Sequence, residues 1–214
     1  MNSNIHLSQL ICSRICHDLV GAAGAINAGV ELLSEDPSDI SAPLGLMATS
    51  AEQVTRRISL FRVAFGFAGG PASPFGVDDI KKLAEEFFAD KKLVLTWDSL
   101  QFEGCDAAQQ SVCGKLLLLM LMLATDCLAR GGQARIHVGA VEGSMGIAIE
   151  ATGMGAKLPE DIWVAFNSSV ETDQITSRNV HAYFTRLLAD SVNGTLEFDL
   201  NADTVQLACV VPKS

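Results

Sequence analysis

The sequence has few basic residues. Its 214 residues include 15 lysines and arginines against 25 aspartates and glutamates, so the formal net charge is -10 at pH 7. A nucleic-acid-binding surface needs clustered lysine and arginine to neutralise phosphates, and this charge therefore argues against a nucleic-acid partner. It does not exclude protein partners that have basic surfaces.

The sequence also lacks a long apolar run. The longest, from Leu116 to Ala124, is far shorter than the roughly 20 residues that a membrane-spanning helix needs. No charged N-terminal stretch is followed by an apolar run and a cleavage site, as a signal peptide requires. Because 49% of the residues are hydrophobic, the chain is globular. We expect a soluble cytoplasmic protein that has no membrane partner.

No two of the six cysteines form a C-x-x-C pair. Most of them lie in apolar helical or strand patterns, which favours buried free thiols over a disulfide framework. Cys12, Cys16 and His17 are close in sequence, but two thiols at i and i+4 with no second ligand pair nearby are a weak metal signal. We expect no metal site and no cofactor of the protein's own.

The first third of the chain has a helical pattern from Ile5 to Phe67, interrupted only at residues 35–39. Pro37 cannot lie inside a helix, and two long helices joined by so short a turn must run antiparallel. The small-residue segment from Gly66 to Pro74 follows and is the best domain boundary in the sequence. The chain therefore divides into a helical hairpin, residues 1–68, and a C-terminal domain, residues 74–214.

The C-terminal domain alternates between helical and strand patterns. Helices are predicted at 77–90, 107–130 and 177–192, and strands at 93–97, 134–141, 145–151, 195–200 and 204–211. Helices interleaved with paired strands indicate an α/β sandwich with helices on one face of a mixed sheet. Together with the hairpin, this gives an α+β fold.

Each helix of the hairpin carries a continuous apolar stripe. The first comprises Ile11, Ile15, Leu19, Ala22, Ile26, Val30 and Leu33, and the second comprises Leu44, Met47, Ala51, Val54, Ile58, Phe61 and Phe65. Two helices alone bury such stripes poorly, whereas a four-helix bundle buries them well. We therefore expect a homodimer in which two hairpins form the bundle. The alternative is that the hairpin packs only on its own C-terminal domain.

His17 lies almost opposite the first stripe, on the solvent face and near the middle of a long helix. Gly21 and Gly24 share its face, although glycine costs about 1 kcal/mol in a helix interior relative to alanine. Two glycines beside one exposed imidazole suggest that another molecule must approach the helix closely. A neutral imidazole is a good nucleophile near pH 7, and phosphoryl transfer needs in-line access and charge stabilisation more than an elaborate pocket.

The hairpin geometry places a basic pair near His17. If the turn centres near Pro37, the residues opposite His17 are Arg56 and Arg57. Guanidinium groups can neutralise a transferring phosphoryl group. The alternative is that both arginines lie on a solvated helix face.

The segments Ser13-Arg14-Ile15-Cys16-His17-Asp18-Leu19 and Gly24-Ala25-Ile26-Asn27-Ala28-Gly29-Val30-Glu31-Leu32-Leu33 resemble the phosphoacceptor helix of the ChpT family. These are dimeric histidine phosphotransferases of alphaproteobacteria. The resemblance implies that His17 is the phosphoacceptor, and one departure is Ala22, where the family carries proline. We assign catalytic roles also to Asp18, Arg56 and Arg57. The residues expected to dock the partner are Ser13, Arg14, Val20, Gly21 and Gly24.

The C-terminal part is similar to a degenerate ATP-binding domain of a histidine kinase. The helix at the position of the kinase N-box contains no asparagine. Ala151, before Thr152-Gly153-Met154-Gly155, stands where the aspartate that binds adenine belongs, and the second glycine box is absent from residues 176–181. The resemblance implies that this domain does not bind ATP and instead helps a receiver domain to dock beside His17. We expect His137 and His181 to be structural or surface residues.

The same resemblance implies the partners. A receiver domain of a CckA-like hybrid histidine kinase would donate the phosphoryl group, with Mg²⁺ bound to that receiver. CtrA-like and CpdR-like response regulators would accept the group. Two alternatives remain: an active histidine kinase with unusual ATP determinants, and a non-catalytic dimeric adaptor for receiver domains.

Overall fold

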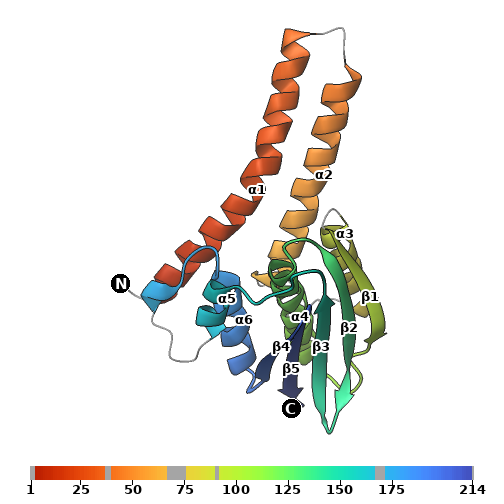
Figure 1. The fold of residues 1–214 in the computed structure, drawn as a ribbon, viewed down its shortest axis with the longest axis vertical. Coiled ribbons are helices and arrows are strands. Elements are labelled where there is room, and N and C mark those ends of the chain that lie inside the picture. The colour runs from red at the N-terminus through yellow and green to blue at the C-terminus, as the bar shows by residue number, and fades with distance from the viewer. Residues whose placement is uncertain (1–2, 37–39, 67–75, 90–91, 167–171, 214) are drawn as a thin grey trace.

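The computed structural model describes residues 3–36, 40–66, 76–89, 92–166 and 172–213. These residues form six α-helices, one short 3-10 helix (η1) and five strands (Figure 1). Their bounds, in chain order, are α1 Ser3–Glu35, α2 Ser41–Ala64, α3 Val77–Phe88, β1 Leu93–Leu100, α4 Ala107–Cys127, β2 Gly132–Val141, β3 Ser144–Thr152, α5 Glu160–Phe166, η1 Thr172–Gln174, α6 Val180–Asp190, β4 Thr195–Asn201 and β5 Thr204–Pro212.

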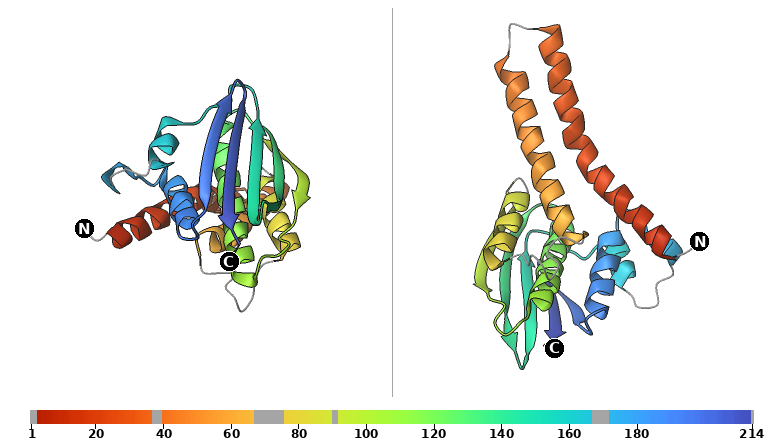
Figure 2. Two further views of the ribbon diagram at one scale, coloured as in Figure 1. Left: turned by 90° about the horizontal axis from the view of Figure 1, so that it is seen from below. Right: turned by 180° about the vertical axis from the view of Figure 1, so that it is seen from behind.

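Helices α1 and α2 form the predicted antiparallel hairpin. The hairpin projects from the rest of the molecule, and its base lies against α3, α4 and α6 (Figures 1 and 2). At this base, buried residues of α2 join the main core, and Leu10, Ile11 and Ile15 of α1 pack against the same core. The hairpin therefore packs partly on its own C-terminal domain. The predicted domain boundary runs from Gly66 to Pro74, and all of it after Gly66 lies outside the described residues.

The five strands form one mixed sheet in the order β1-β2-β3-β5-β4. Strands β1 and β2 are parallel, and all the other neighbouring pairs are antiparallel. The turn between β2 and β3 has positive φ at Glu142 and Gly143, which suits a tight hairpin turn. Helices α3, α4 and α6 cover one face of the sheet (Figure 2, left). The predicted α+β fold is therefore confirmed.

Several helix ends differ from the sequence prediction. Helix α4 ends at Cys127 instead of residue 130, because Gly131, with φ +83°, folds back so that its N–H donates to the Leu128 carbonyl. Helix α6 begins at Val180 instead of residue 177, because the Asn179 side chain accepts a hydrogen bond from the Thr176 N–H and holds a turn there. Helix α5 was not predicted, since its seven residues are too few to show a periodic pattern.

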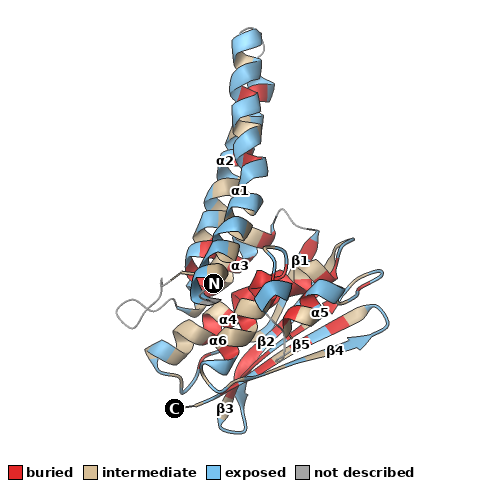
Figure 3. Cartoon of the chain, turned by 90° about the vertical axis from the view of Figure 1, so that its left-hand side faces the viewer, coloured by how far each residue is buried: buried red, intermediate tan, exposed pale blue. Residues whose placement is uncertain are grey.

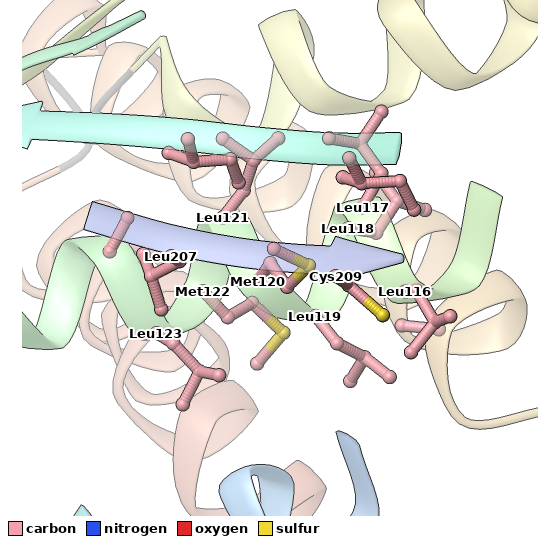
Figure 4. Packing of buried hydrophobic residues seen from close by; sticks show 14 of the residues in the cluster. Leu116, Leu117, Leu118, Leu119, Met120, Leu121, Met122, Leu123, Leu207 and Cys209 are labelled. Carbon is pink, nitrogen blue, oxygen red and sulfur yellow. The ribbon is translucent and has the colours of Figure 1, made fainter. Parts of the chain in front are cut away.

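Helix α4 is the centre of the core. Its first turn is closed by a capping box in which Asp106 and Gln109 exchange side-chain-to-backbone hydrogen bonds. Every side chain from Leu116 to Ala124 is buried, and Figure 4 shows this segment against Leu207 and Cys209 of β5. The helix has the length and composition to cross a membrane, yet 61% of its most apolar window is buried in the structure. It is the core helix of the C-terminal domain.

The hairpin is much less buried than the sheet and its helices (Figure 3). In the two apolar stripes, Ala22 and Phe61 are buried, and most other members are half-buried. Val30, Leu44 and Ile58 remain 48%, 49% and 49% exposed. A single chain therefore leaves part of both stripes uncovered.

Candidate functional site

His17 is an exposed side chain on the middle of α1. Its side chain is 81% accessible, as expected from its place opposite the apolar stripe. The ring is held on one side, where Nδ1 lies 3.2 Å from Oδ1 of Asp18. Because Nδ1 faces a carboxylate, the favoured neutral tautomer carries its proton on Nδ1 and leaves the lone pair on Nε2.

Hydrogen bonds connect Asp18 within α1, to α2 and, through Arg14, to the segment before α6. Its Oδ2 accepts a 2.9 Å hydrogen bond from Nε of Arg14, one turn earlier on α1. Its main-chain carbonyl accepts a hydrogen bond from Arg57 of α2. The other end of the Arg14 guanidinium donates to the carbonyl of Arg178, just before α6, at 2.8 Å. The carboxylate beside His17 is thus tied to both the hairpin and the C-terminal domain.

The structure separates the two arginines that the sequence places opposite His17. Arg57 points to α1 and lines a cavity with His17. Arg56 instead forms an ion pair of 3.0 Å with Glu52, one turn away on α2, and does not line that cavity. Of the two, Arg57 is placed to act near the imidazole.

A cavity of about 230 Å³ opens beside His17 at the junction of the hairpin and the C-terminal domain. Polar groups of the hairpin line one side, and aromatic and polar groups of α3 and α4 line the other. The lining residues are Arg14, His17, Asp18, Gly21, Arg57, Phe61, Phe87, Phe88, Met122, Thr125 and Asp126. The imidazole therefore lies at the mouth of a recess to which both parts of the chain contribute.

The helix face around His17 is open. A Cβ atom added at Gly21 or Gly24 would meet no heavy atom within 4 Å, and Val20 is 65% exposed. Ser13 is also exposed. Arg14, in contrast, is largely buried in its contacts with Asp18 and Arg178. The expected docking residues therefore share one exposed surface, except for Arg14, whose guanidinium is used inside the protein.

A second histidine lies behind the cavity, and the sequence did not reveal its partner. His181 of α6 is completely buried, and its Nε2 lies 2.8 Å from Oδ2 of Asp126, a cavity-lining residue of α4. The expectation that it is structural agrees with this burial. His137 is exposed on β2. Asp126 lies 55 positions earlier in the chain than His181, so only the packing of α4 on α6 reveals that the two are partners.

The six cysteines are free and differ in their burial. Cys12 and Cys16 are exposed on α1, whereas Cys113, Cys127 and Cys209 are buried and Cys105 is partly buried. Burial raises the pKa of each buried thiol from its ordinary value of 9.0 to about 12. In the part of the chain that the structure describes, no group of three or more His, Cys, Asp or Glu side chains could hold a metal ion.

Ala151 and Gly153, which stand in the segment compared above with a kinase nucleotide-binding motif, are both closely packed. Ala151 is fully buried in β3, between Ala134 of β2 and Val205 of β5. Gly153 packs against the backbone of Gly131, and a Cβ atom added at Gly153 would overlap the carbonyl oxygen of Gly131. Neither residue carries a carboxylate or an amide side chain.

Comparison with known proteins agrees with this geometry. The family model described as the histidine phosphotransferase C-terminal domain matches residues 77–204. The protein phosphotransferase ChpT of Brucella abortus (strain 2308) is 30% identical over 203 residues, which cover 95% of this chain and 94% of the relative. A solved bacterial phosphotransferase superimposes with a TM-score of 0.80 at 27% identity, covering 96% of both chains. The Acinetobacter baumannii histidine kinase AdeS is 14% identical with a TM-score of 0.48, covering 92% of this chain and 98% of the kinase chain. The chain therefore belongs to the ChpT family of histidine phosphotransferases, which are transferases of phosphorelay signalling.

Proposed function

We propose that His17 accepts a phosphoryl group from the aspartyl phosphate of one receiver domain and transfers it to the aspartate of another. The observation that carries this proposal is the exposed imidazole, hydrogen-bonded at Nδ1 by Asp18 and surrounded by open helix surface. A phosphorylated receiver can reach Nε2 from solvent without any rearrangement of the hairpin.

The reaction needs little from this chain beyond orientation and charge. Nε2 attacks phosphorus in line, an N–P bond forms, and the O–P bond to the donor aspartate breaks, leaving that aspartate as a carboxylate. The attack places positive charge on the ring, and the Asp18 carboxylate at Nδ1 stabilises it. Mg²⁺ bound to the receiver would neutralise the phosphoryl oxygens. The second transfer is the reverse reaction on another receiver.

Arg57 is the cationic group that best fits a supporting role. It lines the cavity beside His17 and holds the Asp18 carbonyl, so its charge lies near the incoming phosphoryl group. Arg56 is turned toward Glu52 and would contribute less. We assign partner docking to Ser13, Val20 and the two glycines on the solvent face of α1.

We further propose that the C-terminal domain binds no ATP, which distinguishes this protein from an active histidine kinase. Ala151 offers no acceptor for an adenine amino group, and α4 carries no asparagine to orient Mg²⁺. Calorimetric titration with Mg²⁺-ATP should give no saturable heat. Micromolar binding, or phosphorylation by ATP alone, would revive the kinase interpretation.

A homodimer is the state that suits the uncovered apolar stripes. Val30, Leu44 and Ile58 are each about half exposed, and exposed apolar surface of this kind normally marks an interface. Pairing two hairpins across a two-fold axis would bury both stripes and leave each His17 outside the bundle. Light scattering should give twice the 22.7 kDa mass of the chain, and Ile58→Glu should reduce that mass by half.

In the decisive experiment, the protein is incubated with a purified, radiolabelled phospho-receiver of a CckA-like kinase. We expect acid-labile label on the wild-type chain, its onward transfer to a CtrA-like or CpdR-like receiver, and no label on His17→Ala. Because His17 is exposed, that variant should keep its thermal stability. Label on His17→Ala would refute the assignment, and tight receiver binding without transfer would favour the adaptor alternative.

A further inference from the structure

A continuous series of contacts joins the C-terminal domain to the reactive imidazole. It runs from the carbonyl of Arg178 to the guanidinium of Arg14, then to the carboxylate of Asp18, and finally to Nδ1 of His17. We propose that Arg14 is a positioning residue, through which the C-terminal domain fixes the tautomer of His17 for phosphoryl transfer. This inference rests on the proposed function of His17.

The first part of the argument concerns Arg14 itself. Its Nε donates to Oδ2 of Asp18 at 2.9 Å, and its Nη1 donates to the Arg178 carbonyl at 2.8 Å. The guanidinium is planar, so fixing one donor fixes the direction of the other. The Arg14 side chain is only 17% accessible and is therefore not a free surface charge. A lysine at this position could reach one acceptor at a time.

The second part concerns the acceptor in the C-terminal domain. The carbonyl of Arg178 lies in a turn held by the buried side chain of Asn179. The Asn179 amide accepts a hydrogen bond from the Thr176 N–H at 2.8 Å and donates one to the Asp161 carbonyl at 3.0 Å. These bonds join the turn to the start of α5. The acceptor offered to Arg14 is therefore part of a rigid substructure.

The third part concerns Asp18. Its two carboxylate oxygens are divided, with Oδ2 facing Arg14 and Oδ1 facing His17. An exposed carboxylate would rotate freely between rotamers, but this one is anchored on the Arg14 side. The anchor keeps Oδ1 beside Nδ1, so the proton stays on Nδ1 and the lone pair stays on Nε2. His17 is otherwise a highly accessible side chain, and Asp18 limits its rotation.

This series of contacts gives the C-terminal domain a task that needs no nucleotide. By the sequence resemblance to kinases, a second glycine box would be expected at residues 176–181, and this chain lacks it. Here the same turn supplies a hydrogen-bond acceptor to the phosphoacceptor helix. Loss of that bond would free Asp18 and let the ring sample both tautomers.

The test measures the tautomer of His17 directly, by ¹⁵N NMR of the histidine ring nitrogens in the full-length protein without any receiver. We compare wild type with Arg14→Lys and Arg14→Ala. The matched control is Arg186→Lys, because Arg186 also pairs with an aspartate at i+4, Asp190 at 3.3 Å, and its side chain is similarly buried, with only 15% accessible. Thermal melts of all four proteins identify any variant that fails to fold.

We expect wild type and Arg186→Lys to show predominantly the Nδ1–H tautomer, and both Arg14 variants to show a mixture. In single-turnover assays the transfer rate of Arg14→Lys should fall about tenfold or more, as loss of such supporting contacts typically causes. Its affinity for the phospho-receiver should change little, because Arg14 faces inward.

An unchanged tautomer in both folded Arg14 variants would overturn the proposal. A changed tautomer with a normal transfer rate would also overturn the positioning role. A wild-type protein that accepts no phosphoryl group would instead overturn the proposed function. The ¹⁵N spectra would still decide whether Arg14 controls the ring, so the two failures are distinguishable.

Discussion

A leucine at Gly21 should impair phosphoryl transfer and leave the fold intact. Gly21 follows His17 by one turn of α1 and lines the cavity beside it. A Cβ atom there meets no heavy atom within 4 Å, so the Cβ atom of the larger side chain causes no clash within the chain. Replacement of a helical glycine should even stabilise the helix by about 0.5–1 kcal/mol. For a chain of this size that gain corresponds to a rise of roughly 1–4 °C in Tm.

The substitution should instead weaken the binding of the receiver domain. A side chain forced into a close contact costs about 1–3 kcal/mol, which lowers affinity by about 5- to 150-fold. The assay follows label transfer from a phospho-receiver over time at receiver concentrations above and below saturation. We expect a raised apparent KM and an unchanged or higher Tm.

Two other glycines provide controls. Gly45 of α2 is also open, with no heavy atom within 4 Å of an added Cβ, and it does not line the cavity. Gly45→Leu should therefore leave transfer unchanged. Gly29 is buried where α1 meets α2, and an added Cβ would overlap Met47 Cγ, so Gly29→Ala should lower stability. Normal transfer by Gly21→Leu, or an equal loss in Gly45→Leu, would refute the docking assignment.

Three further predictions concern the core and the thiols. The buried thiols of Cys113, Cys127 and Cys209 keep their protons in the folded state up to about pH 12 but lose them near pH 9.0 in the unfolded state. The free energy of unfolding should therefore fall above pH 9, by up to about 1.4 kcal/mol per pH unit for each thiol. Urea titrations from pH 8 to 11 measure this slope, and an unaltered slope in Cys127→Ala would contradict it. Leu119→Ala should lower stability by about 2–5 kcal/mol, because Leu119 is fully buried in α4; a cost under 1 kcal/mol would mean that α4 is not the core. Rapid alkylation of the native protein should be confined to Cys12 and Cys16, and mass spectrometry of the labelled peptides that finds Cys209 modified equally fast would argue against this burial.

The sequence by itself determined most of the helices and strands and the outward direction of His17. The interruption around Pro37 and the helical period on either side were enough to predict the hairpin. The same period placed His17 opposite the apolar stripe, and the structure confirms its exposure. The long leucine run predicted the buried α4, and the Glu142-Gly143 turn joined the predicted strands. These features depend on the local spacing of apolar residues and on turn chemistry, and both can be read from one short segment of sequence.

Only the tertiary structure decided which side chains meet. Arg56 and Arg57 are adjacent in sequence, yet the rotation of α2 against α1 brings one to Asp18 and turns the other to Glu52. Arg14, expected to face a partner, instead reaches a carbonyl 164 positions away, because the base of the hairpin docks against α6. Contacts between distant segments depend on how whole elements pack, and the period of one helix contains no information about its neighbour's rotation or distance.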